Sequence, residues 1–477
     1  MILTIDQGTT SSRAIIFNEH GNIVELHQKE YPLIYPKDGW VEINPSTLLE
    51  SVETTINSCK TKDLKVAAIT NQRETTIVWD RDTGEPIYNA IVWQDRRTSN
   101  FCDDIRNEST LNLIKEKTGL VLDPYFSATK IKWILENVPE ARKKANAGKL
   151  MFGTVDTFLL FKLSKGKIFK TDYTNASRTM LFNINSCQWD KELLQLFDIP
   201  ESMLPEAYPS DSNFGAIEPF NAEVNAVLGD QHAALFGQNC LNESDLKSTY
   251  GTGCFLMANT GTQPISSTSG LLTTIGFSFG GEIKYAIEGS IYSAGTITQW
   301  LRDQLEFFSE AKDSENFLNN NFLSNGVCFI PAFNGLGAPY WNSEIRGSFH
   351  GLTRDSSKHD LITAAISSIS FQTKDIIQSL AKDNINVDAL KIDGGMIENQ
   401  WFINHLSNTT NLKVVLPKNK ESTAFGVAMM AAISSGISSI EVLTNSAIKE
   451  IHPKQGLINQ IEDEYNEWKT LLNKQLG

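Results

Sequence analysis

The sequence predicts an α/β protein built from two similar halves, and three observations support this prediction. The chain has 477 residues, which is more than one typical hydrophobic core accommodates. Short strand-like runs alternate with amphipathic helical runs along most of its length. Both halves also open with the same unit, in which two strands flank a loop of glycine and hydroxyl residues, at 4–17 and 247–261.

The first half begins with three short strand-like runs, at residues 2–5, 14–17 and 23–28. Because short turns connect them, we expect an antiparallel meander. Strand-like sequence returns over 66–80. Helices are predicted over 44–59 and 125–138, where apolar residues fall on one face: Leu48, Leu49, Val52 and Ile56 in the first, and Ala128, Ile131, Ile134 and Leu135 in the second.

The second half repeats this order of elements. After the strand–loop–strand unit we expect an amphipathic helix over 294–308, then a strand, an Asp-Gly-Gly loop and a helix over 389–408, and a closing helix over 460–476. The polar segment 236–246 is the predicted joint, which gives domains 1–241 and 242–477. The small apolar tract 423–437 is interrupted by Ser and Gly, so it predicts a buried helix rather than a membrane span.

Composition and charge exclude several classes of partner. Hydrophobic residues make up 41% and charged residues 21% of the chain, as in ordinary soluble globular proteins. The formal net charge of −14 argues against nucleic acid or an anionic membrane surface as partner. The interrupted apolar tract 423–437 argues against membrane insertion. No basic segment followed by an apolar one suggests secretion, and we expect a cytoplasmic protein.

Cysteine and histidine usage gives no sign of a metal centre. The six cysteines are scattered and form no CxxC pair, and none of the seven histidines has ligand spacing. We therefore expect reduced, mostly buried thiols. His232 and the other histidines are not favoured as catalytic residues either.

The opening stretch TIDQGTTSSRAIIF, residues 4–17, has two interpretations. It contains no GxxxxGK[ST] motif, and no GxGxxG motif opens a helix elsewhere, which excludes the usual nucleotide loops. A glycine-bearing hairpin still presents backbone N–H groups and hydroxyls to phosphate oxygens, and Asp6 could act through Mg²⁺. An ordinary hairpin turn whose hydroxyls bind no ligand is the alternative for this stretch taken alone.

Two later loops favour the phosphate interpretation. The segment YGTGCF, residues 250–255, is a second strand–Gly-Thr-Gly–strand loop, and IDGG, residues 392–395, precedes a helix. Glycines at a helix N-terminus suit a nucleotide. Two hairpins, one in each half, could then face each other across a cleft.

Charged residues at three further positions have a structural and a functional interpretation each. Asp230 follows a strand and precedes an Ala-rich helix, so it is either a helix N-cap or a carboxylate that accepts a proton from an alcohol. Arg73 and Glu74 lie within strand-like sequence and would point to opposite faces unless the strand breaks there. They either belong to a buried ion-pair network or bind a polyol. Trp93 is either a core aromatic residue or part of a ligand site.

These segments together resemble one known family over nearly the whole chain. The resemblance is to the FGGY family of carbohydrate kinases, and NQRET and TDYTNASRTMLFN are typical of its glycerol kinase branch. It rests on the segments IDQGTTSSRA, NQRETTIVW, AIVWQDRRT, TGLVLDPYFSATKIKWILEN, FGTVDTFLL, TDYTNASRTMLFN, GDQHAALFGQ, YGTGCF, GLLTTI, FNGLGAPYW and IDGG.

The resemblance implies two ribonuclease H-like domains of the actin and sugar-kinase type around a central nucleotide cleft. Domain 1–241 would lie on the polyol-binding side and domain 242–477 on the nucleotide-binding side. Glycerol would contact Arg73, Glu74, Trp93, Tyr125, Asp230, Gln231 and Phe255. ATP or ADP would contact Thr9, Thr10, Ser11, Arg13, Thr252, Gly295, Gln299, Gly395 and Asn399.

The resemblance also implies the reaction. ATP and Mg²⁺ would phosphorylate glycerol to sn-glycerol 3-phosphate, with Asp230 as general base and with Asp6 contacting the metal through a water molecule. Relatives are homodimers or homotetramers, so the same is expected here. The alternatives are a kinase for another polyol or sugar, and a non-catalytic actin-like assembly protein that binds ATP.

Two departures from the family pattern give further expectations. Some bacterial relatives bind fructose 1,6-bisphosphate through a Gly-Gly-x-Gly-Gly-x-Arg loop, whereas the corresponding segment 214–227 has neither those glycines nor the arginine. We therefore expect no inhibition by that sugar at millimolar concentration. His232 stands where relatives often have Gln, which is interpreted as tolerated variation.

Overall fold

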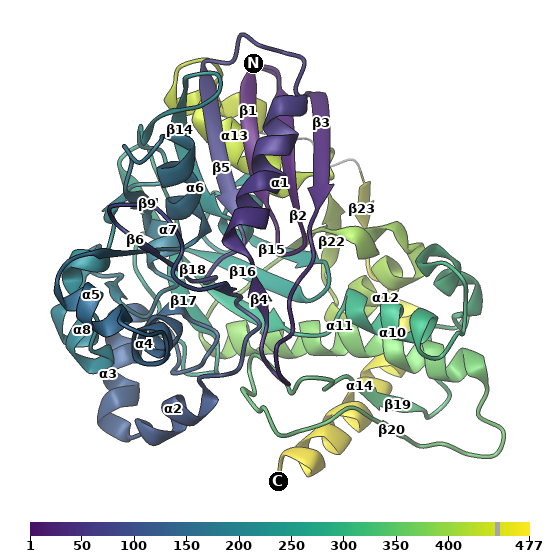
Figure 1. Cartoon of the computed structure of the whole chain (residues 1–477). Coiled ribbons are helices and arrows are strands. Elements are labelled where there is room, and N and C mark those ends of the chain that lie inside the picture. The colour runs from purple at the N-terminus through teal and green to yellow at the C-terminus, as the bar shows by residue number, and fades with distance from the viewer. Residues whose placement is uncertain (444–448) are drawn as a thin grey trace.

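The computed structural model describes residues 1–443 and 449–477. Two mixed β-sheets with helices packed on their faces form two lobes, and the chain begins in the upper lobe of Figure 1 and ends in the lower one. The expectation of two α/β halves is therefore confirmed.

The first lobe is organised around a six-stranded sheet in the order β13-β14-β5-β1-β2-β3. Strands β1, β2 and β3 pair antiparallel, which confirms the predicted meander. Strands β5 and β14 run parallel to β1 and to each other. The bounds are β1 Ile2–Gln7, β2 Ser11–Phe17, β3 Ile23–Glu30, β5 Val66–Asn71, β13 Gly215–Ile217 and β14 Ala222–Gly229.

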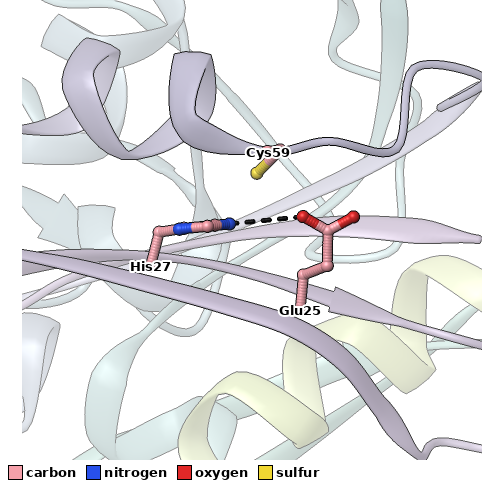
Figure 2. Close-up of side chains that lie close together, drawn as sticks. All are labelled: Glu25, His27 and Cys59. Atoms are coloured by element: carbon pink, nitrogen blue, oxygen red, sulfur yellow. Dashed lines mark hydrogen bonds and ion pairs between the residues drawn. The ribbon is translucent and has the colours of Figure 1, made fainter.

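Helix α1, Pro45–Ser58, packs against β1, β2 and β3 of this sheet. Asn44 caps its N-terminus by accepting the backbone N–H groups of Ser46 and Thr47. Its buried face contains Leu48, Val52 and Ile56 as predicted, and Leu49 is half-buried. At the other end of α1, Cys59 lies over Glu25 and His27 of β3, as Figure 2 shows.

The strand predicted over 66–80 is interrupted. Strand β5 ends at Asn71, and β6 begins only at Ile77 and runs to Asp80. Arg73 and Glu74 lie in the link between them, and Glu74 adopts the left-handed region with φ 59°. The single continuous strand was therefore wrong. The break lets both charged side chains enter one buried site, which adjacent strand residues could not do.

Further helices of the first half surround smaller strand pairs beside the main sheet. Helix α4 carries its predicted stripe, since Ala128, Ile131, Ile134 and Leu135 are all buried. The bounds are α2 Ser99–Asp104, α3 Glu108–Thr118, α4 Ser127–Asn137, α5 Ala141–Asn146, α6 Val155–Leu163, α7 Tyr173–Ala176, α8 Lys191–Phe197 and α9 Asp230–Gly237. The small strands are β4 Glu42–Ile43, β7 Ala90–Ile91, β8 Leu150–Gly153, β9 Lys170–Asp172, β10 Phe182–Asn183, β11 Gln188–Trp189 and β12 Glu206–Tyr208.

The second lobe has a seven-stranded sheet in the order β17-β18-β16-β15-β21-β22-β23. Strands β15 and β16 form the predicted hairpin, and β21 lies parallel to β15 with Thr249 opposite Asp393. This register places the loop after β15 beside the loop after β21. The bounds are β15 Leu246–Tyr250, β16 Cys254–Gly261, β17 Leu272–Phe279, β18 Glu282–Ile291, β21 Ala389–Asp393, β22 Lys413–Leu416 and β23 Lys449–Ile451.

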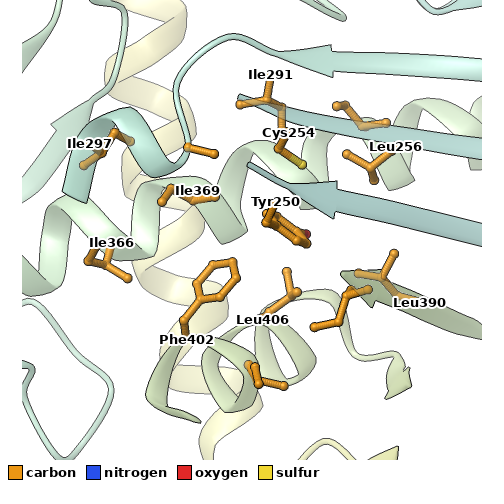
Figure 3. Packing of buried hydrophobic residues seen from close by; sticks show 14 of the residues in the cluster. Tyr250, Cys254, Leu256, Ile291, Ile297, Ile366, Ile369, Leu390, Phe402 and Leu406 are labelled. Carbon is orange, nitrogen blue, oxygen red and sulfur yellow. The ribbon is translucent and has the colours of Figure 1, made fainter. Parts of the chain in front are cut away.

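A continuous apolar core joins this sheet to its helices. Figure 3 shows Tyr250 of the sheet against Phe402, with Ile369 close by, and these side chains are at most slightly exposed. The Tyr250 and Phe402 rings meet edge to face with centroids 5.1 Å apart. The helices are α10 Gly295–Asp303, α11 Lys358–Lys382, α12 Gln400–Thr410 and α14 Gln455–Leu476, and a separate strand pair is β19 Cys328–Ile330 with β20 Ser348–His350.

Helix α13, Ser422–Ser434, belongs to the second half in sequence but packs on the sheet of the first (Figure 1). It crosses α9 at two glycines. A Cβ on Gly237 would lie 2.0 Å from the carbonyl oxygen of Ser422, and one on Gly426 would lie 2.0 Å from that of Ala233. The two lobes thus share apolar packing, and the tract 423–437 is the buried helix that the sequence predicts. The boundary between residues 241 and 242 falls between α9 and β15 and stays a prediction.

Within the described ranges, no helix combines the length and the apolar character that crossing a membrane requires. All six cysteines lie in the described part of the chain and are free thiols. Five of them are buried and Cys187 is half-buried, as expected.

Candidate functional site

In the first lobe, three parallel strands end at the same edge of the sheet. Gln7 of β1 is in register with Asn71 of β5, and Asn71 is in register with Gly229 of β14. Ligands of α/β sheets bind at such carboxyl ends. The residues that follow these strands, including Arg73 and Asp230, therefore gather in one place although they are far apart in the sequence.

In the second lobe, glycine-containing backbone forms the facing edge. The loop between β15 and β16 contains Gly251, whose carbonyl oxygen accepts the N–H of Gly295 at 2.9 Å. A Cβ on Gly295 would lie 2.6 Å from that oxygen. Gly394 has φ 92° and a Cβ there would lie 2.4 Å from the carbonyl oxygen of Tyr250, so only glycine fits. The three glycine segments form one close-packed backbone surface.

A cavity of about 430 Å³ lies between these two edges. All seven residues expected to contact the polyol contribute to its wall, as do Thr9, Thr10, Thr252 and Gln299 from the expected nucleotide set. The complete lining is Thr9, Thr10, Leu33, Tyr35, Arg73, Glu74, Trp93, Gln94, Tyr125, Asp230, Gln231, Thr249, Gly251, Thr252, Gly253, Phe255 and Gln299.

Other expected nucleotide residues are not part of the wall of this cavity. Gly395 is exposed, and a Cβ there would meet no atom within 4 Å, so the space next to it is open. Asn399 caps α12 by accepting the N–H of Phe402 at 2.8 Å. Ser11 begins β2 and is half-buried, and Gly295 begins α10.

Arg13 and Asp6 lie next to each other on β2 and β1 and are paired across the hairpin. Arg13 Nη1 is 3.8 Å from Asp6 Oδ2 and makes a closer ion pair with Glu421 of the second half. The guanidinium is therefore held at the junction between the lobes.

Asp230 is the first residue of α9, and the N-cap position belongs to Gly229, which makes no side-chain capping bond to the described residues. The N-cap alternative for Asp230 is therefore wrong. Its Oδ1 accepts the N–H of Gln231 at 2.7 Å and lies 3.3 Å from Arg73 Nε. Burial raises the pKa of Asp230, with Arg73 opposing that rise. A higher pKa makes a carboxylate a better proton acceptor.

Arg73 and Glu74 are held by a buried network of charges that crosses the lobes. Arg73 forms a forked ion pair with Glu288 of β18, in which Nη2 donates to Oε1 at 3.2 Å and Nη1 donates to Oε2. Arg178 donates through Nε to Glu74 at 2.6 Å and through Nη2 to Glu288 at 2.9 Å. Burial raises the pKa of Glu288, but Arg178 and Arg73 more than offset this and hold it well below its usual range.

The ion-pair alternative for Arg73 and Glu74 is confirmed, and polyol binding by the same residues stays a prediction. The ion-pair network exists, and the same two side chains also reach the cavity. Their charges are thus stabilised by this network, and both side chains also contribute to the cavity wall, although they are only 2% and 1% exposed.

Sequence reasoning missed three buried charges behind the wall. These are Arg178, Glu288 and Lys247. Lys247 Nζ donates to Gln231 Oε1 at 2.5 Å and to Thr249 Oγ1 at 3.1 Å. Burial lowers the pKa of Lys247, with Asp393 opposing. The available signal was a charge within the buried run 285–291 of the strand for Glu288, and membership of the TDYTNASRTMLFN segment for Arg178.

Aromatic rings form the apolar part of the wall. Trp93 packs edge to face with Tyr125 and Phe255, with ring centroids 5.8 Å and 6.0 Å apart. Trp93 is half-buried, and its Nε1 donates to Thr9 Oγ1 at 3.0 Å. Trp93 packs against two apolar core clusters and also borders the cavity, so the core-aromatic interpretation holds in part and a role in a ligand site stays a prediction. Its polar atom fixes the first hairpin loop.

Several carboxylates converge where the two lobes meet. Burial raises the pKa of Asp6 to about 6, with Arg13 opposing and the negative charges of Glu421 and Asp230 adding to the rise. Carboxylates that repel each other in this way favour a bound cation, and Mg²⁺ typically uses one or two carboxylates together with phosphates and water. The donor set around Asp6 thus fits that ion.

His232 occupies an unusual position behind Arg73. It is fully buried, and neither ring nitrogen has a hydrogen-bond partner among the described residues. Burial lowers its pKa well below the usual range, and Arg73 lowers it further, so the ring is neutral. A neutral imidazole packs beside the guanidinium without adding charge.

The fold and the site define a class of protein: two α/β lobes with a cavity between a charged wall and a wall that contains glycine loops, an arrangement typical of small-molecule kinases. Comparison with known families agrees. The N-terminal domain of the FGGY family of carbohydrate kinases matches residues 1–237 and its C-terminal domain matches residues 246–435.

The chain belongs to the FGGY family of carbohydrate kinases. It is 48% identical over 449 residues to a glycerol kinase of Marinomonas sp. (strain MWYL1), covering 91% of this chain and 90% of that protein. It is 48% identical over 446 residues to a glycerol kinase of Clostridium botulinum (strain 657 / Type Ba4), with the same coverage.

Solved structures agree with this assignment. The Plasmodium falciparum glycerol kinase with ADP has a TM-score of 0.90 and 35% identity, covering all of this chain and 98% of that one. A xylulose kinase from Lactobacillus acidophilus has a TM-score of 0.88 at 22% identity, covering 99% and 98%, and shows the same fold. The predicted fold class is confirmed.

Proposed function

We propose that this protein transfers the γ-phosphoryl group of ATP to glycerol and so forms sn-glycerol 3-phosphate and ADP. The observation that carries the proposal is the cavity wall, which combines a fixed guanidinium, two carboxylates and an amide with aromatic rings. Glycerol has three hydroxyls, each of which donates and accepts, on a short carbon chain. The relatives named glycerol kinase support the same substrate.

In this proposal each polar group meets a hydroxyl and the rings cover the carbon chain. Arg73 donates, Glu74 accepts, and Gln231, held by Lys247, can do both. Trp93 and Phe255 pack on the carbon atoms, and Tyr125 completes the wall. Because the network behind Arg73 is already formed, this side chain needs little rearrangement to receive the ligand.

Asp230 acts as the general base. The hydroxyl oxygen of glycerol attacks the γ-phosphorus, the bond from that phosphorus to the oxygen bridging to the β-phosphate breaks, and the proton passes to Asp230. A carboxylate is basic enough if the proton leaves late, after the bond to the leaving group is largely broken. The raised pKa of Asp230 helps it accept that proton.

In this proposal the nucleotide lies mainly against the second lobe, and its terminal phosphates reach the first hairpin. These phosphates would be bound by Thr9, Thr10, Ser11, Arg13 and Thr252. The remainder of ATP would contact Gly295, Gln299, Gly395 and Asn399. The open space beside Gly395 supports this placement.

Asp6 would hold Mg²⁺ through a water molecule. The ion supplies charge neutralisation on the phosphates when it is bound. Asp6 sits opposite Arg13, so the hairpin offers one anionic and one cationic group at the same point. Closure of the two lobes on the ligands would exclude water and limit hydrolysis of ATP.

We also expect a homodimer or homotetramer.

A substrate panel with coupled detection of ADP tests the proposal. Glycerol should have the highest kcat/KM among glycerol, erythritol, xylulose and gluconate. A higher value for any of the others would replace glycerol as the substrate while leaving the kinase assignment in place. ATP-dependent light scattering without glycerol, together with no turnover on the panel, would favour the actin-like assembly protein.

A further inference from the structure

One cluster of potential metal ligands lies outside the site described above. Glu25 and His27 are two residues apart on β3 and therefore point to the same face of the sheet. Cys59 ends α1 and lies over that face. One ligand atom from each of the three residues lies within 4.8 Å of the others. None of them contributes to the wall of the cavity.

Figure 2 shows how these side chains converge. The Cys59 sulfur points into the space between the His27 ring and the Glu25 carboxylate. His27 Nε2 is 3.2 Å from Glu25 Oε2, a spacing that two ligands of one tetrahedral ion also have. We propose that Glu25, His27 and Cys59 form a binding site for Zn²⁺, with water as the fourth ligand.

The carboxylate is held in place independently of any metal. Its Oε2 accepts the N–H of Lys60 at 2.8 Å, and its Oε1 accepts the N–H of Thr61 at 2.8 Å and the Thr61 hydroxyl. Only the side of Oε2 that faces His27 remains for another partner. These bonds act as the outer-shell contacts that orient ligands in metal sites.

The ligand types select the ion. A thiolate with an imidazole and a carboxylate suits zinc, whereas Mg²⁺ and Ca²⁺ prefer oxygen ligands alone. The Glu25 and His27 side chains are 15% and 28% exposed, so water can reach the fourth position from their side, while Cys59 is buried. A site with three protein ligands keeps such an open position.

Binding requires the thiol to lose its proton. Burial raises the pKa of Cys59 to about 11, with Glu25 adding to the rise and Lys62 opposing it. The ion therefore displaces the thiol proton, which goes to solvent, and it replaces the hydrogen bond between His27 and Glu25. The product is a sulfur–zinc bond with no change in oxidation state.

The bound ion would join the end of α1 to β3. The same helix is already linked to β2 through the Ser51 and Ser12 hydroxyls, whose oxygens are 2.7 Å apart. The alternative is a metal-free cluster, in which Glu25 only fixes the 60–61 backbone and Cys59 is an ordinary buried thiol. Spectroscopy separates the two because only a metal site gives a sulfur-to-metal charge-transfer band.

The experiment titrates the full chain with Co²⁺ as a spectroscopic substitute for zinc. The protein is reduced, treated with a chelator, desalted and kept free of nucleotide. We expect a near-ultraviolet thiolate-to-cobalt band with the visible absorption of tetrahedral cobalt, saturating at one ion per chain and abolished by one equivalent of Zn²⁺. Weak octahedral absorption without the thiolate band would overturn the proposal.

Variants assign the band to this cluster. Cys59→Ser should abolish the thiolate band, and His27→Asn should weaken Zn²⁺ binding at least about 100-fold, since even loss of outer-shell partners costs 10–100-fold. Cys187→Ser, at the half-buried thiol, and His20→Asn, at an exposed histidine, are the controls and should change neither. A band that survives Cys59→Ser, or zinc affinity that survives His27→Asn, contradicts the site. His27 is on the accessible side of the cluster, so its variant is informative even if Cys59→Ser folds poorly.

Discussion

The two walls of the cavity are built on different principles. The wall from the first lobe uses side-chain charge, with Arg73, Glu74 and Asp230 at its centre. The wall from the second lobe uses backbone, with Gly251 and Gly253 in one loop and further glycines packed behind it. The first wall needs support for its charges, and the second needs the absence of Cβ atoms at its glycine positions.

The difference follows from what each wall would recognise. Hydroxyl groups carry no net charge, so a protein recognises them through hydrogen-bond donors and acceptors that point in defined directions. Such donors and acceptors are selective when they are buried and held in place. Phosphate oxygens are recognised well by backbone N–H groups, which approach closely only when Cβ atoms are missing. Glu288 connects the two walls, because it belongs to the second lobe and its ion pair holds Arg73 of the first lobe in place.

The largest expected effect comes from Asp230→Asn on the charged wall. The substitution keeps the volume and removes the proton acceptor, so kcat should fall about 10²- to 10⁴-fold with ATP binding unchanged. Steady-state kinetics and nucleotide binding by calorimetry measure the two quantities. Near-normal turnover would leave Asp230 without a role in proton transfer.

Glu288→Gln tests whether the charged wall depends on support from the other lobe. We expect kcat/KM for glycerol to fall about 10- to 100-fold, mostly through KM, because Arg73 and Arg178 lose a shared anion. Removing one partner of a buried ion pair should also lower the free energy of unfolding by about 3 kcal/mol. Glu282→Gln, at an exposed position of the same strand, is the matched control. A change in the KM for ATP alone would contradict the supporting role.

Asp6→Asn tests the electrostatic strain at the edge of the charged wall. The pKa of Asp6 rises from 3.8 to about 6 in the folded protein, so the folded state binds the proton more tightly than the unfolded state. The stabilisation that this bound proton gives the folded state is therefore fully present below about pH 4 and is lost as the pH rises through about 6. The shift of about 2 pKa units corresponds to roughly 3 kcal/mol in the free energy of unfolding.

Because asparagine carries no charge, unliganded Asp6→Asn should be more stable than the parent at pH 8 and show a smaller gain at pH 5. Urea denaturation at the two pH values measures this, with exposed Asp63→Asn as control. A gain that does not depend on pH would mean that charge is not its cause.

A pair of glycine substitutions tests the backbone wall, with the smallest expected effect. Gly395→Ala should keep its melting temperature, because a Cβ there meets no atom within 4 Å, and should raise the KM for ATP about tenfold by narrowing the nucleotide space. Gly394→Ala should instead destabilise the fold by about 1–3 kcal/mol, since its Cβ would lie 2.4 Å from Tyr250 oxygen. Equal losses of stability in both variants would argue against this division of roles.

The sequence predicted the local elements well where a pattern is periodic. The meander of β1 to β3, the stripe on α4 and the hairpin of β15 and β16 all follow from short-range rules. It failed at 66–80, where apolar residues continue on both sides of Arg73 and Glu74 and hide the break between two strands. The reason for that break is tertiary, because the charges it brings together come from distant segments.

By itself, the sequence determined the two α/β halves, the family, and eleven of the seventeen residues that line the cavity, because these depend on periodicity and on contiguous motifs that resemble the family. Tertiary structure alone decided which groups support those motifs. It placed Glu288 behind Arg73, laid α13 of the second half on the first sheet, and brought Cys59 over Glu25 and His27. Such pairings join residues separated by tens to hundreds of positions, and only the packing of complete elements brings them into contact.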